Sequence, residues 1–152
     1  MNTAHRTASA TKRRWTADPM SMFKVMNKIE PFNSEELLRL ELPIRLSFEA
    51  LRTGKGMEND FHDLAAAINT AMVRSEDVDP LCELTAIAAR DALMRCWHRH
   101  QRTGAWGFDG PALLEVEAGI DLHEQLVRLS TPLQMIEALR TVMQRGRCGE
   151  VV

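Results

Sequence analysis

The chain has 152 residues, of which 45% are hydrophobic and 26% are charged, and its formal net charge is −2. This length suits a single domain with a sizeable core, and no apolar run approaches the roughly 20 residues that a membrane-spanning helix needs. The N-terminus carries basic residues but no apolar segment directly after them, so we expect no secretory signal, no membrane anchor and a cytoplasmic location.

The amino-acid usage favours an all-α fold. Good helix formers such as Leu, Ala, Met, Glu and Arg are abundant, whereas aromatic residues make up 5% and tyrosine is absent. The alternation of apolar and polar residues that marks a half-buried strand does not occur along the chain. The 3 cysteines are odd in number and lack a regular spacing, so we expect free thiols in a reducing compartment.

Residues 1–30 are predicted to form a basic N-terminal arm that is partly disordered. They contain six basic residues against two acidic ones, a net charge of +4, whereas residues 31–152 contain thirteen against nineteen, a net charge of −6. The arm can therefore bind phosphate groups or an acidic protein surface, or it can be a solubilising terminus. Within it, the apolar residues 22–26 are expected to dock onto the helical body. The candidate nucleic-acid-binding residues, which include an indole that can stack on a base, are Lys12, Arg13, Arg14 and Trp15.

Capping signals divide residues 31–146 into five helices, which together form the bundle domain. Asp79 and Pro80 give the clearest start, an N-cap residue followed by a proline in the first turn. Pro43 lies inside the first helix and should kink it or split it in two. The expected helices run from Ser34 to Gly54, from Asn59 or Asp60 to Arg74, from Asp79 to Gly104, from Asp109 to Ser130 and from Thr131 to Gly146. Residues 147–152 are expected to form a frayed tail.

Two of the expected helices are apolar on more than one side. At about 100° per residue, the second and fifth helices each show one apolar stripe, as surface helices do, with Thr70 on the polar side of the second. The first and fourth helices each show two, and their second stripes are Leu38/Leu42/Leu46 and Leu122/Leu126/Leu129. Such a helix is either central in a bundle or packed against a second copy of the chain. The sequence favours the central position and leaves a homodimer open.

Few residues have the chemistry of a metal or catalytic site. Cys96 and His100 lie one turn apart on the apolar face of the third helix, and His123 could supply a third metal ligand. Histidines of a packed helix more often form hydrogen bonds, so we expect these three residues to be structural and expect no metal and no cofactor. The carboxylates of Asp60 and Asp63 fit helix capping, and no nucleophile with a partner base is evident. The chain is therefore not expected to be an enzyme.

Four apolar residues are candidates for contact with a protein partner. Trp106 and Phe108 lie in a glycine-rich loop, where they either plug the open end of the bundle or bind a partner. Ile87 and Met94 lie on the polar side of the third helix and are expected to be exposed. The last turns of that helix also carry three arginines, which suit the negative end of the helix dipole: Arg95, Arg99 and Arg102.

Several short motifs occur in a fixed order: Lys12-Arg13-Arg14, Asp18-Pro19-Met20 and Val25, a leucine-rich helix, Gly54 and Gly56, and Ala66-Ala67-Ile68-Asn69. In this order the chain resembles a group of small uncharacterised all-helical proteins encoded by tailed phages, prophages and plasmids of Gram-negative bacteria, over residues 12–142. The resemblance implies an accessory gene of a mobile element and supplies no catalytic residues. Some of these proteins carry a transcription-regulator label, but no recognition helix is evident in this sequence.

Three functions follow as hypotheses. The first is a non-catalytic mobile-element accessory protein that binds and modulates a host protein or nucleoprotein complex, such as a defence system. The second is a small DNA-associated regulator, in which a dimer supplies the scaffold and the basic arms hold phosphate. The third is a helical hydrolase or metal enzyme, which would depend on Cys96, His100 and His123.

Overall fold

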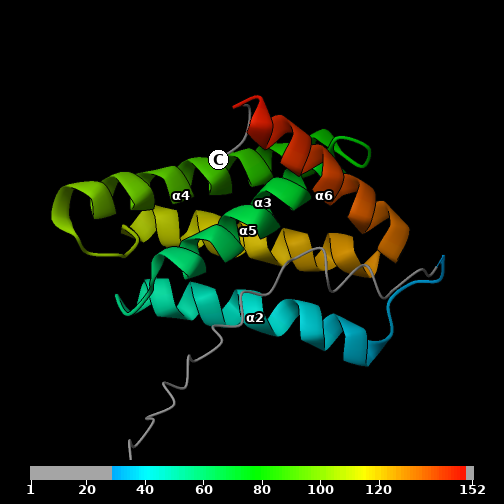
Figure 1. Ribbon diagram of the computed structural model, residues 1–152, viewed down its shortest axis with the longest axis horizontal. Coiled ribbons are helices and arrows are strands. Elements are labelled where there is room, and N and C mark those ends of the chain that lie inside the picture. Colours follow the sequence, from blue (N-terminus) through cyan, green and yellow to red (C-terminus); the bar gives the residue numbers. More distant parts are fainter. Residues whose placement is uncertain (1–28, 150–152) are drawn as a thin grey trace, which may run out of the picture.

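The computed structural model describes residues 29–149, which form five helices and no strand (Figure 1). The helices are α2 (Ser34–Arg52), α3 (Glu58–Ser75), α4 (Pro80–Thr103), α5 (Gly110–Arg128) and α6 (Pro132–Arg147). The prediction of an all-α five-helix bundle is confirmed. The candidate nucleic-acid residues Lys12, Arg13, Arg14 and Trp15 and the apolar segment 22–26 lie outside the described residues.

The helix starts follow the capping signals, and α2 begins at Ser34 as expected. Its N-cap is the preceding residue, Asn33, whose side chain accepts from the N–H groups of Glu35 and Glu36, both at 3.0 Å. The Glu36 carboxylate accepts in turn from the Asn33 N–H at 2.9 Å, which completes a capping box.

The N-caps of α4 and α5 are the residues that the sequence predicts. The Asp79 carboxylate accepts from Leu81 N–H at 2.6 Å, and Asp109 accepts from Ala112 N–H at 2.7 Å. α4 ends at Gly104, whose φ of 70° is left-handed and suits glycine. α3 begins slightly earlier than expected, at Glu58.

Pro43 does not divide the first helix. α2 runs continuously from Ser34 to Arg52, so the alternative in which Pro43 splits it in two is wrong. Proline removes one backbone donor, which leaves the carbonyl four residues earlier without its helical partner. That carbonyl belongs to Arg39, and both Arg39 and Pro43 are solvent-exposed, so water can bind it.

α3 is the most central helix of the bundle. The sequence had instead indicated a surface helix with a single buried stripe. It contacts all four other helices. Thr70, expected on the polar side, is 2% exposed, and Ser75 is 1% exposed. Their hydroxyls donate to the carbonyls of Ala66 and Ala71, each at 2.7 Å, so both side chains are buried with their hydrogen bonds satisfied.

α5 shares the centre with α3, as its two apolar stripes suggest. One stripe joins the main core beside α4, where Val116 and Ile120 are fully buried. On the other, Leu122 and Leu126 pack with the α3 and α4 residues of a second cluster, whereas Leu129 is exposed. In residues 29–149, no helix combines the length and the apolar character that a membrane crossing requires.

Candidate interaction surfaces

The outer face of α2 carries a row of exposed leucines, called here the leucine ridge: Leu38, Leu42 and Leu46. Their exposed fractions are 59%, 50% and 61%. A spacing of four residues aligns them on one side of the helix, about 180° around the axis from the fully buried Leu51. α2 therefore has one apolar face in the core and another in solvent. In Figure 1, α2 forms one edge of the bundle, with no other described helix on its outer side.

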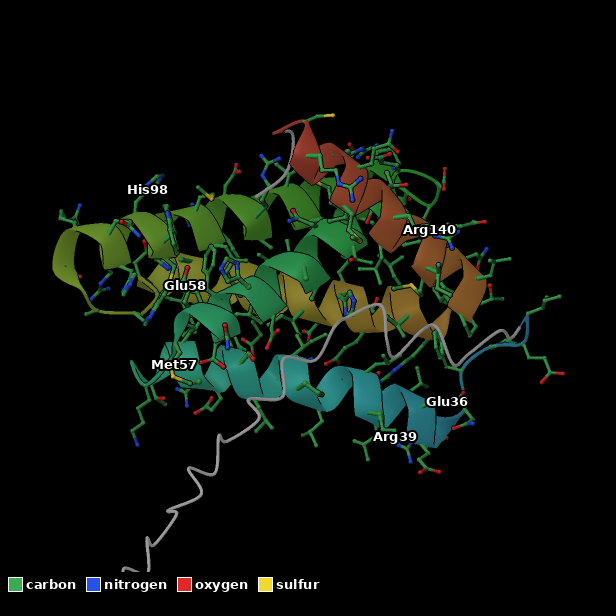
Figure 2. The ribbon with its side chains drawn as sticks, viewed as in Figure 1. Glu36, Arg39, Met57, Glu58, His98 and Arg140 are labelled. Atoms are coloured by element: carbon green, nitrogen blue, oxygen red, sulfur yellow. The ribbon has the colours of Figure 1, made fainter. Side chains whose placement is uncertain are left out.

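The charged side chains at both ends of the leucine ridge are paired within α2. Arg39 binds Glu35 at 2.5 Å, and Arg52 binds Glu49 at 2.5 Å. Figure 2 shows Arg39 on the side of α2 that is turned away from the other helices. Within each of these two pairs the opposite charges compensate one another, so the leucine ridge between them offers apolar contact.

Ion pairs on the other side of α2 fix the helix to α5. The Arg45 guanidinium donates from Nε and Nη2 to Glu124, at 2.6 and 2.8 Å, and also binds Asp121. The bonds to Glu124 and Asp121 raise the pKa of Arg45 above its already high ordinary value. Arg128 of α5 binds Glu41 through two bonds of 2.9 and 3.0 Å. The leucine ridge therefore lies on a helix held at several points.

Trp106 closes one end of the bundle. It is 8% exposed, and its indole stacks on the imidazole of His100 with centroids 3.8 Å apart and planes 4° from parallel. Phe61 lies against the same indole at 5.6 Å, and Phe108 stacks on Phe48 at 5.7 Å. This is the arrangement of a structural plug, and it leaves little of Trp106 for a partner to contact.

The structure does not bring the three candidate metal ligands together. Cys96 is 2% exposed and His123 is 6% exposed, whereas His100 is half-buried against Trp106. Within residues 29–149, no group of three His, Cys, Asp or Glu side chains is placed to hold a metal ion. Cys96 and His123 instead belong to the packed interior, and His100 is part of the aromatic end.

His123 is a buried histidine without a local partner. Its Nδ1 accepts or donates no hydrogen bond among the described residues. Burial lowers the pKa of His123 from 6.5 to about 4, while the nearby Glu41 carboxylate acts in the opposite direction. The side chain is therefore neutral at pH 7.

Ile87 and Met94 are less accessible than the sequence indicated. Both are half-buried, and Ile87 packs against the cluster that contains Leu122 and Leu126 of α5. Ile87 lies about 100° around α4 from the fully buried Ala86, so its side chain reaches the flank of the core. The expectation that this side of α4 displays two apolar residues to solvent is wrong.

The carboxylates near the start of α3 have structural contacts. Asp60 accepts from the Met57 N–H at 2.7 Å, which confirms its expected capping role. Asp63 accepts from the buried Ser47 hydroxyl at 3.1 Å, and partial burial raises the pKa of Asp63. His62 lies 3.5 Å from Glu58 and does not join this pair.

A basic face of α4, unassigned to a site by the sequence, borders a surface hollow of about 380 Å³. The hollow lies between the last turns of α4 and the loop that leads to α5. The spacing of Arg95, Arg99 and Arg102 in the sequence indicates such a face, although arginines near the end of a helix are also explained by the helix dipole. Its lining residues are Arg95, Cys96, His98, Arg99, Arg102, Gly107 and Asp109.

Comparisons of this chain with protein-family models, with curated proteins and with solved structures give no match.

Proposed function

We propose that this chain is a non-catalytic accessory protein of a mobile element, which binds a host protein or nucleoprotein complex through the leucine ridge. The observation that carries the proposal is that α2 is apolar on its solvent face as well as on its core face. Burying three half-exposed leucines in an interface contributes about 1 kcal/mol each, so the leucine ridge can supply part of the binding energy of a protein contact. While these leucines are exposed to solvent, they do not stabilise the core of the bundle.

Charge supports a partner that normally handles nucleic acid. Residues 31–152 carry a net charge of −6, with Lys55 as the single lysine. An acidic helical body can compete with phosphate for a basic channel, and this gives a mechanism for blocking a nucleoprotein machine. Cys82, Cys96 and Cys148 are free thiols, which supports an action in the reducing cytoplasm.

The experiment compares two sets of leucine substitutions. The test variant is Leu38→Gln/Leu42→Gln/Leu46→Gln. The control is Leu114→Gln/Leu129→Gln, which alters a leucine of α5 and the C-cap residue of α5, 66% and 79% exposed. Host proteins that cross-link to the wild-type chain are identified, purified and titrated with each variant. We expect the ridge variant to weaken the reconstituted complex at least about tenfold and the control to leave it unchanged.

Light scattering on the same proteins tests a second copy as the occupant of the leucine ridge. A dimer that dissociates only in the ridge variant would assign the ridge to self-association and contradict the proposed partner contact. A host complex that persists unchanged in the ridge variant would also contradict it.

The second candidate function, a DNA-associated regulator, is favoured by the net charge of +4 in residues 1–30. Binding to DNA over a salt series distinguishes it from the first. A regulator of this kind is retained on DNA at low salt and released steeply as salt rises, whereas the first candidate is not retained on DNA and binds its partner through the leucine ridge.

A further inference from the structure

Three arginines point from one side of the last turns of α4. Arg95, Arg99 and Arg102 have spacings of four and three residues, which place them within about 60° of one another around the helix axis. His98 lies at the edge of the same face, and Figure 2 shows it on the outer side of α4. These four side chains line the 380 Å³ hollow together.

The loop after α4 forms the opposite wall of the hollow. Gly107 has a φ of 151°, which side chains rarely allow, and a Cβ at this position would lie 4.0 Å from the Arg99 guanidinium carbon. The backbone of the loop thus approaches the arginine face closely. Cys96, a core residue that is 2% exposed, is also among the lining residues. Burial raises the pKa of Cys96, so the thiol is neutral at pH 7 and does not repel an anion.

The arginines differ in how far their charges are compensated. Arg95 binds Glu115 and lies 3.7 Å from Asp109. Arg99 and Arg102 form no ion pair with any acid of residues 29–149. They therefore bring two uncompensated positive charges to a body that is otherwise acidic.

Helix capping does not account for these two arginines. The carbonyl of Arg99 accepts from the Thr103 hydroxyl at 2.8 Å, and that of His100 accepts from the Gly104 N–H at 2.7 Å. Backbone and hydroxyl donors thus satisfy these carbonyls at the end of α4, and the guanidinium groups of Arg99 and Arg102 are left to face the hollow.

We propose that the hollow binds the phosphomonoester group of a small molecule, with Arg99 and Arg102 as its principal contacts. A phosphomonoester carries a charge of about −1.5 to −2 at pH 7, which matches the two free guanidinium charges. Guanidinium groups bind phosphate oxygens through paired hydrogen bonds, and His98 at the rim offers a further donor. A volume of about 380 Å³ holds a phosphate with a sugar-sized group.

A small ligand fits this position better than a nucleic-acid duplex does. Asp109 lines the hollow, Glu115 binds the lining residue Arg95, and residues 31–152 have a net charge of −6, so an extended polyanion would meet repulsion on the adjacent surfaces. A single phosphate in the hollow faces one lining acid, Asp109, which lies 3.7 Å from Arg95.

The test is isothermal titration with inorganic phosphate, AMP and adenosine. We expect phosphate and AMP to bind and adenosine not to bind. Arg99→Gln/Arg102→Gln should weaken AMP binding at least about tenfold, and Arg99→Lys/Arg102→Lys should retain part of the affinity because it keeps the charge. The matched control is Arg140→Gln, which removes an exposed arginine of α6 and should leave the affinity unchanged (Figure 2).

Circular dichroism establishes that each variant is folded before its affinity is compared. The proposal is overturned if neither phosphate nor AMP binds at millimolar concentration, or if Arg140→Gln weakens binding as much as the double variant. It is also overturned if a duplex without terminal phosphates binds through Arg99 and Arg102 more tightly than AMP, which would assign the face to a nucleic-acid backbone. None of these outcomes depends on the leucine ridge, so the proposed function is tested separately.

Discussion

Gly119 of α5 packs directly on Ala89 of α4, and a Cβ added to Gly119 would overlap the Ala89 methyl group. The same Cβ would lie 3.5 Å from Cγ1 of Ile68, so α3, α4 and α5 all meet at this point. Small residues on α4 let the helices approach closely, since Ala86, Ala89 and Ala92 are all fully buried. The central packing of the bundle therefore depends on the absence of a side chain at Gly119.

Gly119→Ala is expected to destabilise the protein by about 1–3 kcal/mol. Alanine favours a helix by about 1 kcal/mol over glycine, but here its methyl group must push α4 away, because the opposing Ala89 side chain is short and cannot move aside. Urea denaturation measures the change. Gly110→Ala is the matched control on α5, since a Cβ there has open space, and it should leave the stability unchanged or slightly higher.

Combining Gly119→Ala with Ala89→Gly moves the methyl group from one helix to the other. The double variant should recover part of the lost stability, because the overlap is relieved although α4 then contains an internal glycine. If Gly119→Ala alone is as stable as the wild-type chain, the close approach of α4 and α5 is contradicted.

The helix ends could be predicted from the sequence because their signals are local. Asp79 with Pro80 and Gly104 act through hydrogen bonds and backbone angles within a few residues, and the structure confirms them. The central role of α3 could not be predicted. Thr70 looks polar in a helical projection and Ser75 lies beyond the expected end of the helix, but each hydroxyl binds a carbonyl of α3 and is compatible with burial.

The candidate surfaces were only partly predictable, for a different reason. The second stripe of α2 was visible, but whether Leu42 is buried depends on where the other helices pack, which periodicity does not determine. Arg99 and Arg102 were visible as well, yet the hollow beside them forms only when Gly107 turns the loop back along α4. Trp106 is the opposite case, because the alternative of a bundle plug was already evident from the loop.

His123 should make stability fall as the solution becomes acidic. Its pKa is about 4 in the folded state and 6.5 in the unfolded chain, so the unfolded chain binds the proton more readily. The contribution of the neutral His123 to the unfolding free energy is complete above about pH 6.5 and is lost as the pH falls toward 4. The difference between the two pKa values corresponds to about 3 kcal/mol of unfolding free energy. Urea denaturation at about pH 7 and about pH 4.5 measures it.

His123→Gln cannot titrate in this range and should show a smaller loss of stability on acidification than the wild-type chain. The control is His62→Gln, since the His62 side chain is 61% exposed and should leave the pH dependence as it is. Equal pH dependence in His123→Gln and in the wild-type chain would mean that His123 is not buried in its neutral form.

The stack of His100 on Trp106 gives a prediction about the aromatic end of the bundle. His100→Ala should lower the unfolding free energy by about 1–2 kcal/mol, because it removes a parallel ring contact and opens space beside the indole. His98→Ala, on the exposed side of α4, should have little effect. Elemental analysis of the purified proteins tests the metal alternative: stoichiometric zinc that is lost in His100→Ala would contradict the structural role of this histidine.

Deletion of residues 1–15 tests the basic arm. Residues 1–15 consist mainly of small, polar and basic residues, so the truncated chain should keep its helical circular dichroism and its unfolding temperature. If Lys12, Arg13 and Arg14 bind a polyanion, the deletion should abolish retention on DNA, and the binding of the full chain should fall steeply with salt and vary little with sequence. This dependence on salt but not on sequence is expected when a few side chains bind phosphates and none binds a base. A full-length chain that DNA does not retain even at low salt would exclude the regulator and leave the arm as a solubilising tail or a segment that a protein partner binds.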